Sequence, residues 1–468
     1  MKKLLFYFTG GILIAFSFFA CHDDDDDLNI PEATIETNKW IKSTMEDFYL
    51  WNNEMPGIDY TRQDDPEAYF YDLLNKDDKW SWITSDYPSL AAEYNGNPVT
   101  MGYDPTFYRF SGDGGIFMVV NYVYPGSAAD VAGLKRGDLI LSINNTPLDT
   151  INYSALYSGT SYSVQLGKAT VNGGSVSIGY SGESIGLTAQ TTTTDPSIYH
   201  KIIETGGHKI GYFVYTEFVT GNNDAFLSTM DAVFSEFKSA GITDLVVDLR
   251  YNPGGDIDAA VHLASEIAPL SAVNGEEVLV NLLYNDAIQP VYEAAYPEEL
   301  SYKFTKEASV SNVNMSAVYF LTTDGTASAS ELTISGLDPY MDLVQIGDST
   351  YGKYVGAYVI PDDNNEWAIV PIVMKYSNAE GYTDFKKGLI PDYVMDDQWL
   401  ITNPVAFGDL SDPMLATAVG LISGVQPEAL GTRAAVAPLL NFKRFVPRSE
   451  KAEMKRNVYL PSMKGITR

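Results

Sequence analysis

Leu245-Val246-Val247-Asp248-Leu249-Arg250-Tyr251-Asn252-Pro253-Gly254-Gly255 is the stretch that decides the fold of this 468-residue chain. Its apolar first half predicts a buried strand, and its Asn-Pro-Gly-Gly end predicts a turn in which two residues are free to adopt positive φ. Apolar residues between Ala259 and Ala264 predict a helix behind the turn. Such a turn lets backbone N–H groups approach a bound carbonyl closely, although a tight turn without a ligand has the same sequence.

A serine stands at the start of a helix in a second strand-and-helix unit downstream. The apolar run 317–321 predicts a buried strand, Asp324-Gly325 ends it, and a helix begins at Ser328. A helix N-terminus offers unpaired N–H groups and the positive end of the helix dipole, which favour an oxyanion beside the serine. Because Glu331 follows three positions later, an ordinary capping box is the competing interpretation.

Lys353, 25 residues beyond Ser328, is the candidate base. A lysine has a pKa of about 10.4, so action as a base near neutral pH needs a downward shift of about three units, or roughly 4 kcal/mol against the charged form. The tyrosines and aliphatic residues around Lys353 predict a setting of low polarity, which produces such shifts. A surface lysine on a hairpin is the alternative. The four histidines, which we interpret as structural although a Ser-His-Asp triad is not excluded by counting, are His22, His200, His208 and His262.

Three motifs together resemble the carboxy-terminal processing, or tail-specific, serine protease family. They are the Asp-Leu-Arg-x-Asn-x-Gly-Gly turn, the Thr-Ala-Ser-Ala-Ser-Glu run around Ser328 and the Gly-Lys pair ending at Lys353. The segment 388–392, Gly-Leu-Ile-Pro-Asp, resembles the late Gly-x-x-Pro-Asp segment of that family. The resemblance runs from about residue 98 to about residue 400 and implies a mixed α/β (α+β) fold with a crotonase-like or Clp-protease-like core.

The resemblance also implies roles for individual residues. Ser328 would be the nucleophile and Lys353 the general base of a serine endopeptidase that works through an acyl-enzyme. The oxyanion hole would come from the N–H group of Ala329 and from a glycine of the pair Gly254 and Gly255. Glu331 would support the site without taking part in bond making. This chemistry requires no metal and no organic cofactor.

One position departs from the family pattern. Many members carry a glutamine four residues after the lysine, which orients it, whereas this chain has Ala357. We expect another group, such as Tyr354 or Tyr358, to position Lys353. The departure leaves open a binding protein that keeps the protease fold without turnover. A third interpretation is a scaffold lipoprotein that uses only the groove of its PDZ-like module.

That module lies between residues 98 and 188, where the segments 122–129 and 132–144 resemble the PDZ domains of this family. They predict a strand, a short helix ended by Gly133, a Gly-Asp turn and an alternating strand over 139–143. Such domains bind an extended peptide by adding it to a sheet edge. A small β domain that only braces the core is the alternative.

The N-terminus indicates export and a lipid anchor. Three residues, Met-Lys-Lys, and the apolar stretch 4–20 are typical of a signal peptide. Cys21, the single cysteine, follows directly and resembles the lipidation site of bacterial lipoproteins, although an incidental cysteine is the alternative. The acidic block 23–27 is either a plain linker or resembles the signal that sends Bacteroidetes-type lipoproteins to the cell surface. We expect a lipid-anchored outer-membrane protein at the cell surface, with the periplasmic face as the alternative.

Charge and composition complete the expected organisation. A formal net charge of −31 argues against nucleic acid as a partner and leaves polypeptides as substrates, with membrane contact only through the lipid anchor. The sequence predicts no particular oligomeric state. From residue 441 onward, eight Lys or Arg stand against two Glu, which predicts a mobile tail or one that lies on the acidic body. The expected segments are a lipoprotein signal peptide (1–21), an acidic linker (22–33), an N-terminal helical domain (34–97), the PDZ-like domain (98–188), the protease core (189–430) and a basic C-terminal tail (431–468).

Overall fold

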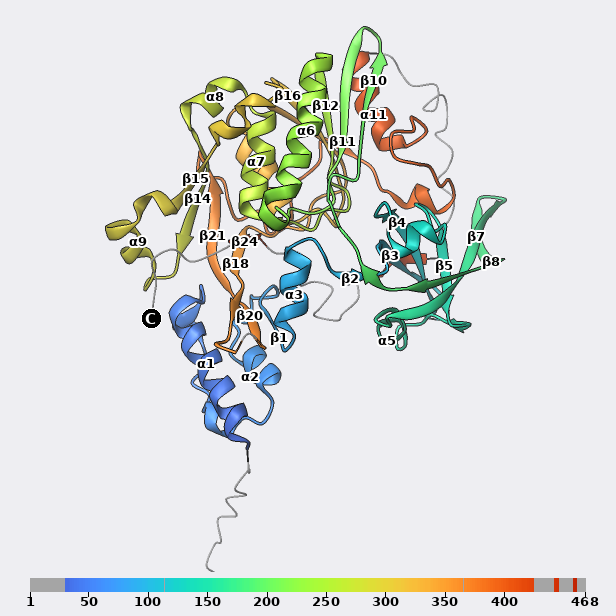
Figure 1. Ribbon diagram of the computed structural model, residues 1–468. Helices are drawn as coiled ribbons and strands as arrows, with labels where there is room; N and C mark the ends of the chain where they lie inside the picture. Colours follow the sequence, from blue (N-terminus) through green and yellow to red (C-terminus); the bar gives the residue numbers. More distant parts are fainter. Residues whose placement is uncertain (1–29, 113, 365, 425–441, 446–457, 461–468) are drawn as a thin grey trace, which may run out of the picture.

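The computed structural model describes residues 30–112, 114–364, 366–424, 442–445 and 458–460. Figure 1 shows the core at the top, the N-terminal helices below it and the PDZ-like domain to one side. None of the helices in these described ranges is long and apolar enough to span a bilayer. The predicted signal peptide, Cys21 and most of the acidic linker lie outside the described residues.

A six-stranded sheet forms the centre of the core, in the order β10-β11-β12-β16-β17-β22. The predicted strand 245–249 is β12 (Asp244–Asp248), and the predicted strand 317–321 is β16 (Ala317–Thr322). From β11 to β22 neighbouring strands run parallel. Because the carboxyl ends of parallel strands meet at one edge of a sheet, the segments that follow β12, β16 and β17 emerge side by side. The remaining strands of this sheet are β10 (Tyr199–Thr205), β11 (His208–Val214), β17 (Asp342–Gly347) and β22 (Tyr393–Val394).

Helices cover both faces of this sheet. The helix α11 (Pro413–Ser423) packs on one face against Val246 and Leu321. On the other face lie α6 (Ala225–Ala240), α7 (Ile257–Ile267) and α10 (Ala329–Leu337), whose apolar side chains join those of Leu245 and Val247. Side chains of adjacent residues on a strand point to opposite faces, so β12 is buried on both.

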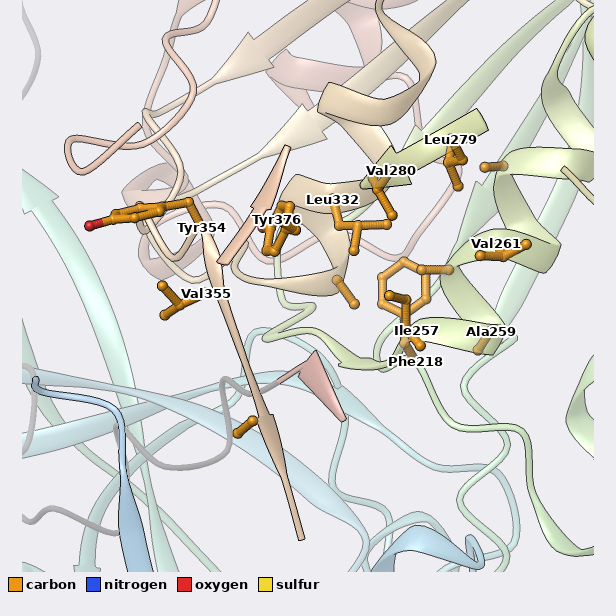
Figure 2. Packing of buried hydrophobic residues seen from close by; sticks show 14 of the residues in the cluster. Phe218, Ile257, Ala259, Val261, Leu279, Val280, Leu332, Tyr354, Val355 and Tyr376 are labelled. Atoms are coloured by element: carbon orange, nitrogen blue, oxygen red, sulfur yellow. The ribbon is translucent and has the colours of Figure 1, made fainter. Parts of the chain in front are cut away.

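A second sheet packs against the same helices, in the order β13-β24-β18-β21-β14-β15. Figure 2 shows Leu332 of α10 and Ile257 of α7 packed with Val280 of β14 and Tyr376 of β21. This packing fixes the short strands that follow Gly254 and Lys353 relative to the nucleophile helix. The strands are β13 (Gly255–Asp256), β24 (Val458–Leu460), β18 (Val355–Tyr358), β21 (Ile372–Asn378), β14 (Val278–Tyr284) and β15 (Ser301–Lys303), and the helices α8 (Leu270–Gly275) and α9 (Gln289–Ala295) lie nearby in the chain.

The PDZ-like domain is built on the path β23-β3-β4-β5-β7-β8. The predicted strand 139–143 is β5 (Leu139–Ile143), and the short helix before Gly133 is α4 (Ala128–Val131). Its core of Met118, Ile140 and Val164 is separate from that of the protease-like core. The other elements are β3 (Tyr103–Phe110), β4 (Ile116–Val123), β6 (Thr146–Pro147), α5 (Tyr153–Tyr157), β7 (Ser161–Asn172) and β8 (Ser175–Thr188), with β2 (Val99–Thr100) paired to β9 (Gln190–Thr191).

The N-terminal domain packs directly on the core. The helix α1 (Glu32–Phe48) buries Ile41 and Met45, and α2 (Pro66–Asp72) begins after Asp65, whose side chain caps the helix. After these helices β1 (Trp82–Thr84) pairs with β20 (Ala368–Val370), which in turn pairs with β19 (Ile360–Pro361), and α3 (Tyr87–Tyr94) follows. The domain is therefore tied to the core by backbone hydrogen bonds as well as by apolar contacts.

The described parts of the basic C-terminal segment pair with the rest of the protein, which agrees with the alternative to a mobile tail. Most of 431–468 lies outside the described residues, but Phe442–Arg444 forms β23, and Val458–Leu460 forms β24. The first pairs with β3 of the PDZ-like domain and the second with β13 and β18 of the core. Pairing at a sheet edge uses backbone groups and needs no apolar periodicity in the added strand, so the sequence pattern gave no signal for it.

Candidate active site

Ser328 stands on a strained turn between β16 and α10. Its φ of 59° and ψ of −110° lie outside the regions that a serine ordinarily adopts, and it immediately precedes the first helical residue, Ala329. A nucleophile on a strained strand-to-helix turn is a recurring hydrolase arrangement. The residue is fully buried, and its Oγ has no hydrogen-bond partner among the described residues. The Ser328 N–H donates to the Glu331 carboxylate at 2.8 Å, which is one half of the capping box that the sequence suggested.

The strained turn is fixed by hydrogen bonds to the motif segment after β12. The Ala327 N–H and the Ser330 hydroxyl both donate to the carbonyl of Asn252, each at 3.1 Å. The Thr326 hydroxyl donates to the carbonyl of Leu249 at 2.7 Å. These bonds join the two predicted motifs and restrict the movement of Ser328 relative to the glycine turn.

Lys353 is fully buried rather than exposed on a hairpin. Burial lowers its pKa well below the ordinary value, and the negative charges of Asp78 and Glu331 oppose part of this shift. The direction of the shift favours a neutral amine, which is the form that can accept a proton.

Glu331 joins the serine segment to the lysine segment. Its carboxylate accepts hydrogen bonds from the N–H of Ser328 (2.8 Å), the N–H of Lys353 (2.9 Å), the N–H of Gly352 (2.7 Å) and the hydroxyl of Thr350 (2.5 Å). Burial raises the pKa of Glu331 to about 7, while these four donors act in the opposite direction. Glu331 thus connects the backbone of Ser328 to that of Lys353, and the supporting role that the resemblance implies stays a prediction.

Tyr376 of β21 makes a second link between the same two segments. Its hydroxyl lies 2.7 Å from the carbonyl of Lys353, to which it donates, and 3.2 Å from that of Ser328. The sequence gives no sign of this role, because a tyrosine in an apolar strand carries no signal beyond burial.

The turn that contains Gly254 and Gly255 lies directly against Ser328, because neither glycine has a side chain. Gly254 and Gly255 have φ values of 107° and 136°, and a β carbon on Gly254 would lie 2.9 Å from the Ala329 nitrogen. The Gly254 N–H already donates to the Asn252 side chain at 2.9 Å. The other predicted glycine donor, Gly255, pairs with Val458 of β24 in this structure and is the one that could complete an oxyanion hole with Ala329 once β24 is displaced.

The late Gly-x-x-Pro-Asp segment supports the lysine segment from behind. Leu389 and Thr350 are joined by two hydrogen bonds. In the first, the Thr350 N–H donates to the Leu389 carbonyl at 3.1 Å. The Leu389 N–H donates to the Thr350 hydroxyl at 2.7 Å. A β carbon on Gly388 would lie 1.9 Å from the Thr350 carbonyl oxygen, so only glycine fits there.

Comparisons with known proteins agree with this geometry. The profile of peptidase family S41 matches residues 209–395, that of the S41 N-terminal domain residues 36–82, and that of a PDZ domain residues 119–162. The chain belongs to peptidase family S41.

Several curated members of this family are similar in sequence. The chain is 26% identical to a carboxyl-terminal-processing protease of Picosynechococcus sp. over 290 residues, which cover 58% of this chain and 59% of the relative. It is 25% identical to a chloroplastic C-terminal processing peptidase of Tetradesmus obliquus over 352 residues, 72% of this chain and 70% of the relative. The chain thus spans between about six and seven tenths of the length of these two relatives.

A solved structure from the S41 family is also similar in fold. A Bacteroides fragilis protein assigned to the S41 proteases superimposes with a TM-score of 0.69 at 29% identity, covering 83% of this chain and 98% of that one. The predicted mixed α/β fold with a PDZ-like domain is confirmed.

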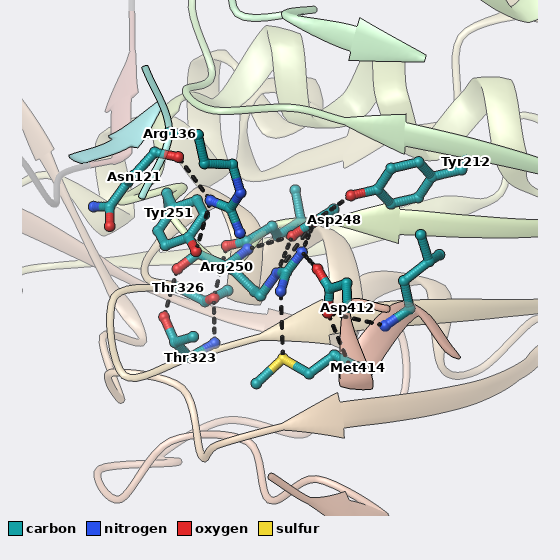
Figure 3. Close-up of polar contacts among 12 residues, drawn as sticks. Asn121, Arg136, Tyr212, Asp248, Arg250, Tyr251, Thr323, Thr326, Asp412 and Met414 are labelled. Atoms are coloured by element: carbon teal, nitrogen blue, oxygen red, sulfur yellow. Dashed lines mark hydrogen bonds and ion pairs between the residues drawn. The ribbon is translucent and has the colours of Figure 1, made fainter. Parts of the chain in front are cut away.

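A buried ionic network lies behind the S41 motif turn, as Figure 3 shows. Arg250 is fully buried and donates to Asp248 at 2.6 Å and to Asp412 of the α11 cap at 2.7 Å. The Tyr212 hydroxyl donates to Asp248 at 2.7 Å. The two carboxylates hold the pKa of Arg250 well above its ordinary value, and Arg250 lowers that of Asp248 against the effect of burial.

The PDZ-like domain contacts the same turn through Arg136. Its guanidinium donates to the Tyr251 hydroxyl at 3.0 Å and lies over the Phe407 ring, 4.2 Å from the centroid. Tyr251 belongs to the S41 motif that ends in the two glycines. The domain that was predicted to bind peptides is thus in direct contact with the segment that carries the candidate oxyanion hole.

The structure also shows what surrounds Lys353 in place of the expected glutamine. The hydroxyl of Tyr358 pairs with that of Tyr284 at 2.9 Å, and the ring of Tyr354 packs on Trp80. The charges that act on Lys353 are those of Glu331 and of Asp78, which comes from the N-terminal domain. Asp78 was missed by sequence reasoning, because 275 residues separate it from Lys353 and no local pattern marks it.

Asp78 is itself held in place by two hydroxyl groups. Tyr49 donates to its carboxylate at 2.8 Å, and Ser81 donates at 2.5 Å. The Ser81 hydroxyl in turn accepts from the Ile372 N–H of β21 at 2.8 Å. The N-terminal domain therefore contributes to the electrostatics of the site and does more than pack on the core.

A cavity of about 690 Å³ opens beside the lysine segment, between the N-terminal domain and the core. Gly352, Tyr354 and Val355 form part of its wall. Its charged lining residues are Glu54, Asp77, Lys79, Asp286, Lys375, Asp384 and Lys386. The surface next to the candidate base is thus of mixed charge.

The histidines that were weighed as alternative bases pair with carboxylates elsewhere. His200 lies 3.2 Å from Glu236 and His208 lies 2.7 Å from Asp244. His262 lies 2.6 Å from Asp231, in a cluster that includes Glu266. His22 lies outside the described residues.

Proposed function

We propose that the protein is a serine endopeptidase that cleaves polypeptides with a Ser328/Lys353 dyad. The observation that carries the proposal is the combination of a buried Lys353, whose pKa is lowered by burial, with a strained Ser328 joined to it through Glu331. Three of the four hydrogen bonds that Glu331 accepts come from the segment that bears Lys353, and a lysine exposed on the surface would not require such a fixed backbone. The alternative, suggested by Ala357, is a protein that binds peptides without cleaving them. Such a protein would not need this arrangement of Ser328, Glu331 and Lys353.

In the acylation step the neutral Lys353 amine takes the Ser328 hydroxyl proton as Oγ attacks the peptide carbonyl carbon. The carbonyl oxygen becomes an oxyanion, which the N–H groups of Ala329 and Gly255 stabilise. The Lys353 ammonium then donates its proton to the amine of the leaving peptide, the C–N bond breaks, and an ester on Ser328 remains.

Deacylation repeats the sequence with water as nucleophile. Lys353 removes a proton from water, the hydroxide attacks the ester carbonyl, and the same two N–H groups stabilise the oxyanion. Lys353 returns the proton to Oγ as the acyl C–O bond breaks. The second product is released with a new carboxyl group, and the enzyme is restored.

The substrate class follows from the relatives and from the PDZ-like domain. The curated relatives are named carboxyl-terminal-processing proteases, so we infer that this chain also acts on the C-terminal parts of polypeptides. The PDZ-like domain would recruit them by adding the substrate as a strand. The contact between Arg136 and Tyr251 supports a coupling between recruitment and the oxyanion hole.

The location remains as the sequence suggested, a lipid-anchored outer-membrane protein that faces the cell surface. Its support is the signal peptide, Cys21 and the acidic block that follows. Metabolic labelling with a fatty acid tests the anchor: wild type should incorporate label, and Cys21→Ala should not. Protease accessibility on intact cells separates the surface from the periplasmic face.

The activity is tested with protein that begins after Cys21. We expect wild type to cleave casein, and Ser328→Ala and Lys353→Ala to lose roughly 10³-fold or more in kcat. Lys375→Ala is the matched control, since this half-buried lysine lies on β21 and pairs with Asp384. Equal cleavage by wild type and Ser328→Ala, or a strong loss in Lys375→Ala alone, would overturn the assignment of the dyad.

A further inference from the structure

Two strands of the second sheet border the candidate site and do not pair with each other. They are β13, which begins directly after Gly254, and β18, which begins two residues after Lys353. The C-terminal strand β24 lies between them and pairs in parallel with both. Its register joins Val458 to Gly255 and Tyr459 to Asp256 on one side, and Tyr459 to Ala357 and Leu460 to Tyr358 on the other.

This position is next to the reacting groups. Gly255 is the candidate oxyanion donor, and β13 continues the turn that lies against Ser328. The other neighbour, β18, continues the segment that bears the candidate base. A backbone that runs between the two strands therefore passes along the catalytic residues. Figure 1 shows β24 beside β18, although its sequence lies about 100 residues downstream.

The space between β13 and β18 has the width of one strand. Neighbouring strands lie about 4.7–4.9 Å apart, so two strands that share a partner are separated by roughly twice that distance. Without an occupant, both would present unpaired N–H and C=O groups across the gap, and such edges favour strand addition. Backbone pairing places few demands on side chains, so different polypeptides can use the same space.

The segment that supplies β24 is held near this space from its beginning. Upstream, β23 pairs with β3, and Phe442 of β23 is buried against Tyr108 and Phe117. Arg444 forms an ion pair with Asp324, in the loop that precedes Ser328. Only the residues 446–457 separate this anchored stretch from β24. A short tether of this kind gives an effective concentration in the millimolar range.

The charge of the C-terminal segment also favours its position between β13 and β18. Between residues 446 and 468 the sequence has six Lys or Arg and two Glu, whereas the whole chain has a formal net charge of −31. A basic segment is attracted to an acidic body, and the attraction is weakened by salt.

We propose that the gap between β13 and β18 is a strand-binding site, and that the chain's own segment Val458–Leu460 occupies it in competition with polypeptide substrates. The competition rests on the proposed function; the binding of the segment does not. In the occupied state a substrate reaches Ser328 only after β24 leaves the gap. At rest, the route to Ser328 is therefore partly blocked by the chain's own C-terminal segment. A substrate displaces this segment when its effective concentration at the gap is the higher of the two.

The binding is measured without catalysis, in a Ser328→Ala background. One protein ends at residue 468, and a second ends at Phe445 so that β23 and the Arg444 ion pair remain. The probe is a fluorescent peptide of residues 453–463, followed by anisotropy. We expect the shortened protein to bind it at least tenfold more tightly than the full chain. Equal affinity of the two, or no binding to a shortened protein of unchanged melting temperature, would overturn the proposal.

A point variant tests the same idea in the full chain. Tyr459→Pro removes a backbone N–H from the centre of β24 and disfavours pairing with both neighbours. It should bind the labelled peptide as the shortened protein does. Thr467→Pro, eight residues further on, is the matched control and should behave as the unaltered chain. The same affinity in both proline variants contradicts the assignment to β24.

Cleavage of casein by the wild-type serine forms then tests the competition. The shortened protein and Tyr459→Pro should show a several-fold lower KM than the full chain, and added peptide 453–463 should raise it again. Peptide binding with no cleavage by any form would leave the strand-binding site standing and remove the proposed function. Cleavage with the same KM for all forms would leave the proposed function standing and overturn the competition between β24 and substrates. Rapid removal of the chain's own segment, seen by mass spectrometry, would identify it as a substrate and overturn the competition.

Discussion

Gly254 lies so close to Ser328 that a β carbon at position 254 would stand 2.7 Å from the β carbon of the serine. The same added carbon would lie 2.9 Å from the Ala327 carbonyl oxygen and 2.9 Å from the Ala329 nitrogen. The motif glycine therefore does more than permit a turn. Its lack of a side chain is what allows the strained nucleophile and its helix start to sit against the oxyanion segment.

Gly254→Ala should accordingly damage catalysis more than stability. We expect kcat on casein to fall at least 100-fold, because Ser328 and the Ala329 N–H must move, with a loss of about 1–3 kcal/mol in the free energy of unfolding. Gly207→Ala is the control, since Gly207 also has positive φ but has open space where the β carbon would be. It should cost about 1 kcal/mol and leave kcat unchanged. Equal kcat values for the two variants would contradict the close-approach argument.

Asp78→Asn should move the pH dependence of the reaction. The Asp78 charge raises the pKa of Lys353 against the effect of burial, so its removal lowers that pKa further. In the proposed mechanism neutral Lys353 is the base, so kcat/KM rises as pH increases through its pKa, and this acidic limb should shift to lower pH in the variant. The measurement is kcat/KM against pH, with the exposed neighbour Asp77→Asn as the control. A shift toward higher pH, or an equal shift in the control, would count against a charge effect from Asp78.

Lys353→Met should abolish cleavage and stabilise the fold. The pKa of Lys353 is lowered in the folded state, so the unfolded chain binds more protons at neutral pH and the wild type gains stability as pH rises toward about 10.4. An apolar side chain of similar length removes this cost. We expect the free energy of unfolding, measured with urea at pH 7, to be on the order of 1–4 kcal/mol higher for the variant than for wild type. This difference should become smaller toward pH 10. A variant that is less stable than wild type at every pH would refute this account.

Asp412→Ala should destabilise the protein strongly although Asp412 is far from Ser328 in sequence. It leaves Arg250 fully buried with one carboxylate fewer and removes the cap of α11, whose Met414 N–H donates to Asp412 at 3.0 Å. We expect a loss of about 3–5 kcal/mol in the free energy of unfolding. Asp409→Ala changes an exposed carboxylate three residues away, which accepts from the Ser411 N–H, and should cost less than about 1 kcal/mol. Similar losses in the two variants would show that the ionic network contributes little.

The strands β12 and β16 and the helix start at Ser328 could be predicted because apolar runs there end in turn residues. The family could be predicted because three motifs in the chain resemble those of the family, and the catalytic roles that the resemblance implies stay predictions. The contribution of Asp78 could not be predicted, since it depends on how the N-terminal domain docks on β21. The pairing of Val458–Leu460 was equally hidden, because a strand added through its backbone needs no characteristic side chains.

The bond between Arg250 and Asp412 has a consequence for the order in which the site is completed during synthesis. The two residues are 162 positions apart, and Ser328, Lys353 and the glycine turn all emerge from the ribosome before Asp412 does. Until then the guanidinium behind the motif turn has only part of its counter-charge, and the face of the sheet that α11 covers is open to water. A nascent chain therefore carries both residues of the proposed dyad before it has the carboxylate and the helix that complete the packing behind the motif turn. We expect the proposed activity to appear only after α11 has folded onto the sheet.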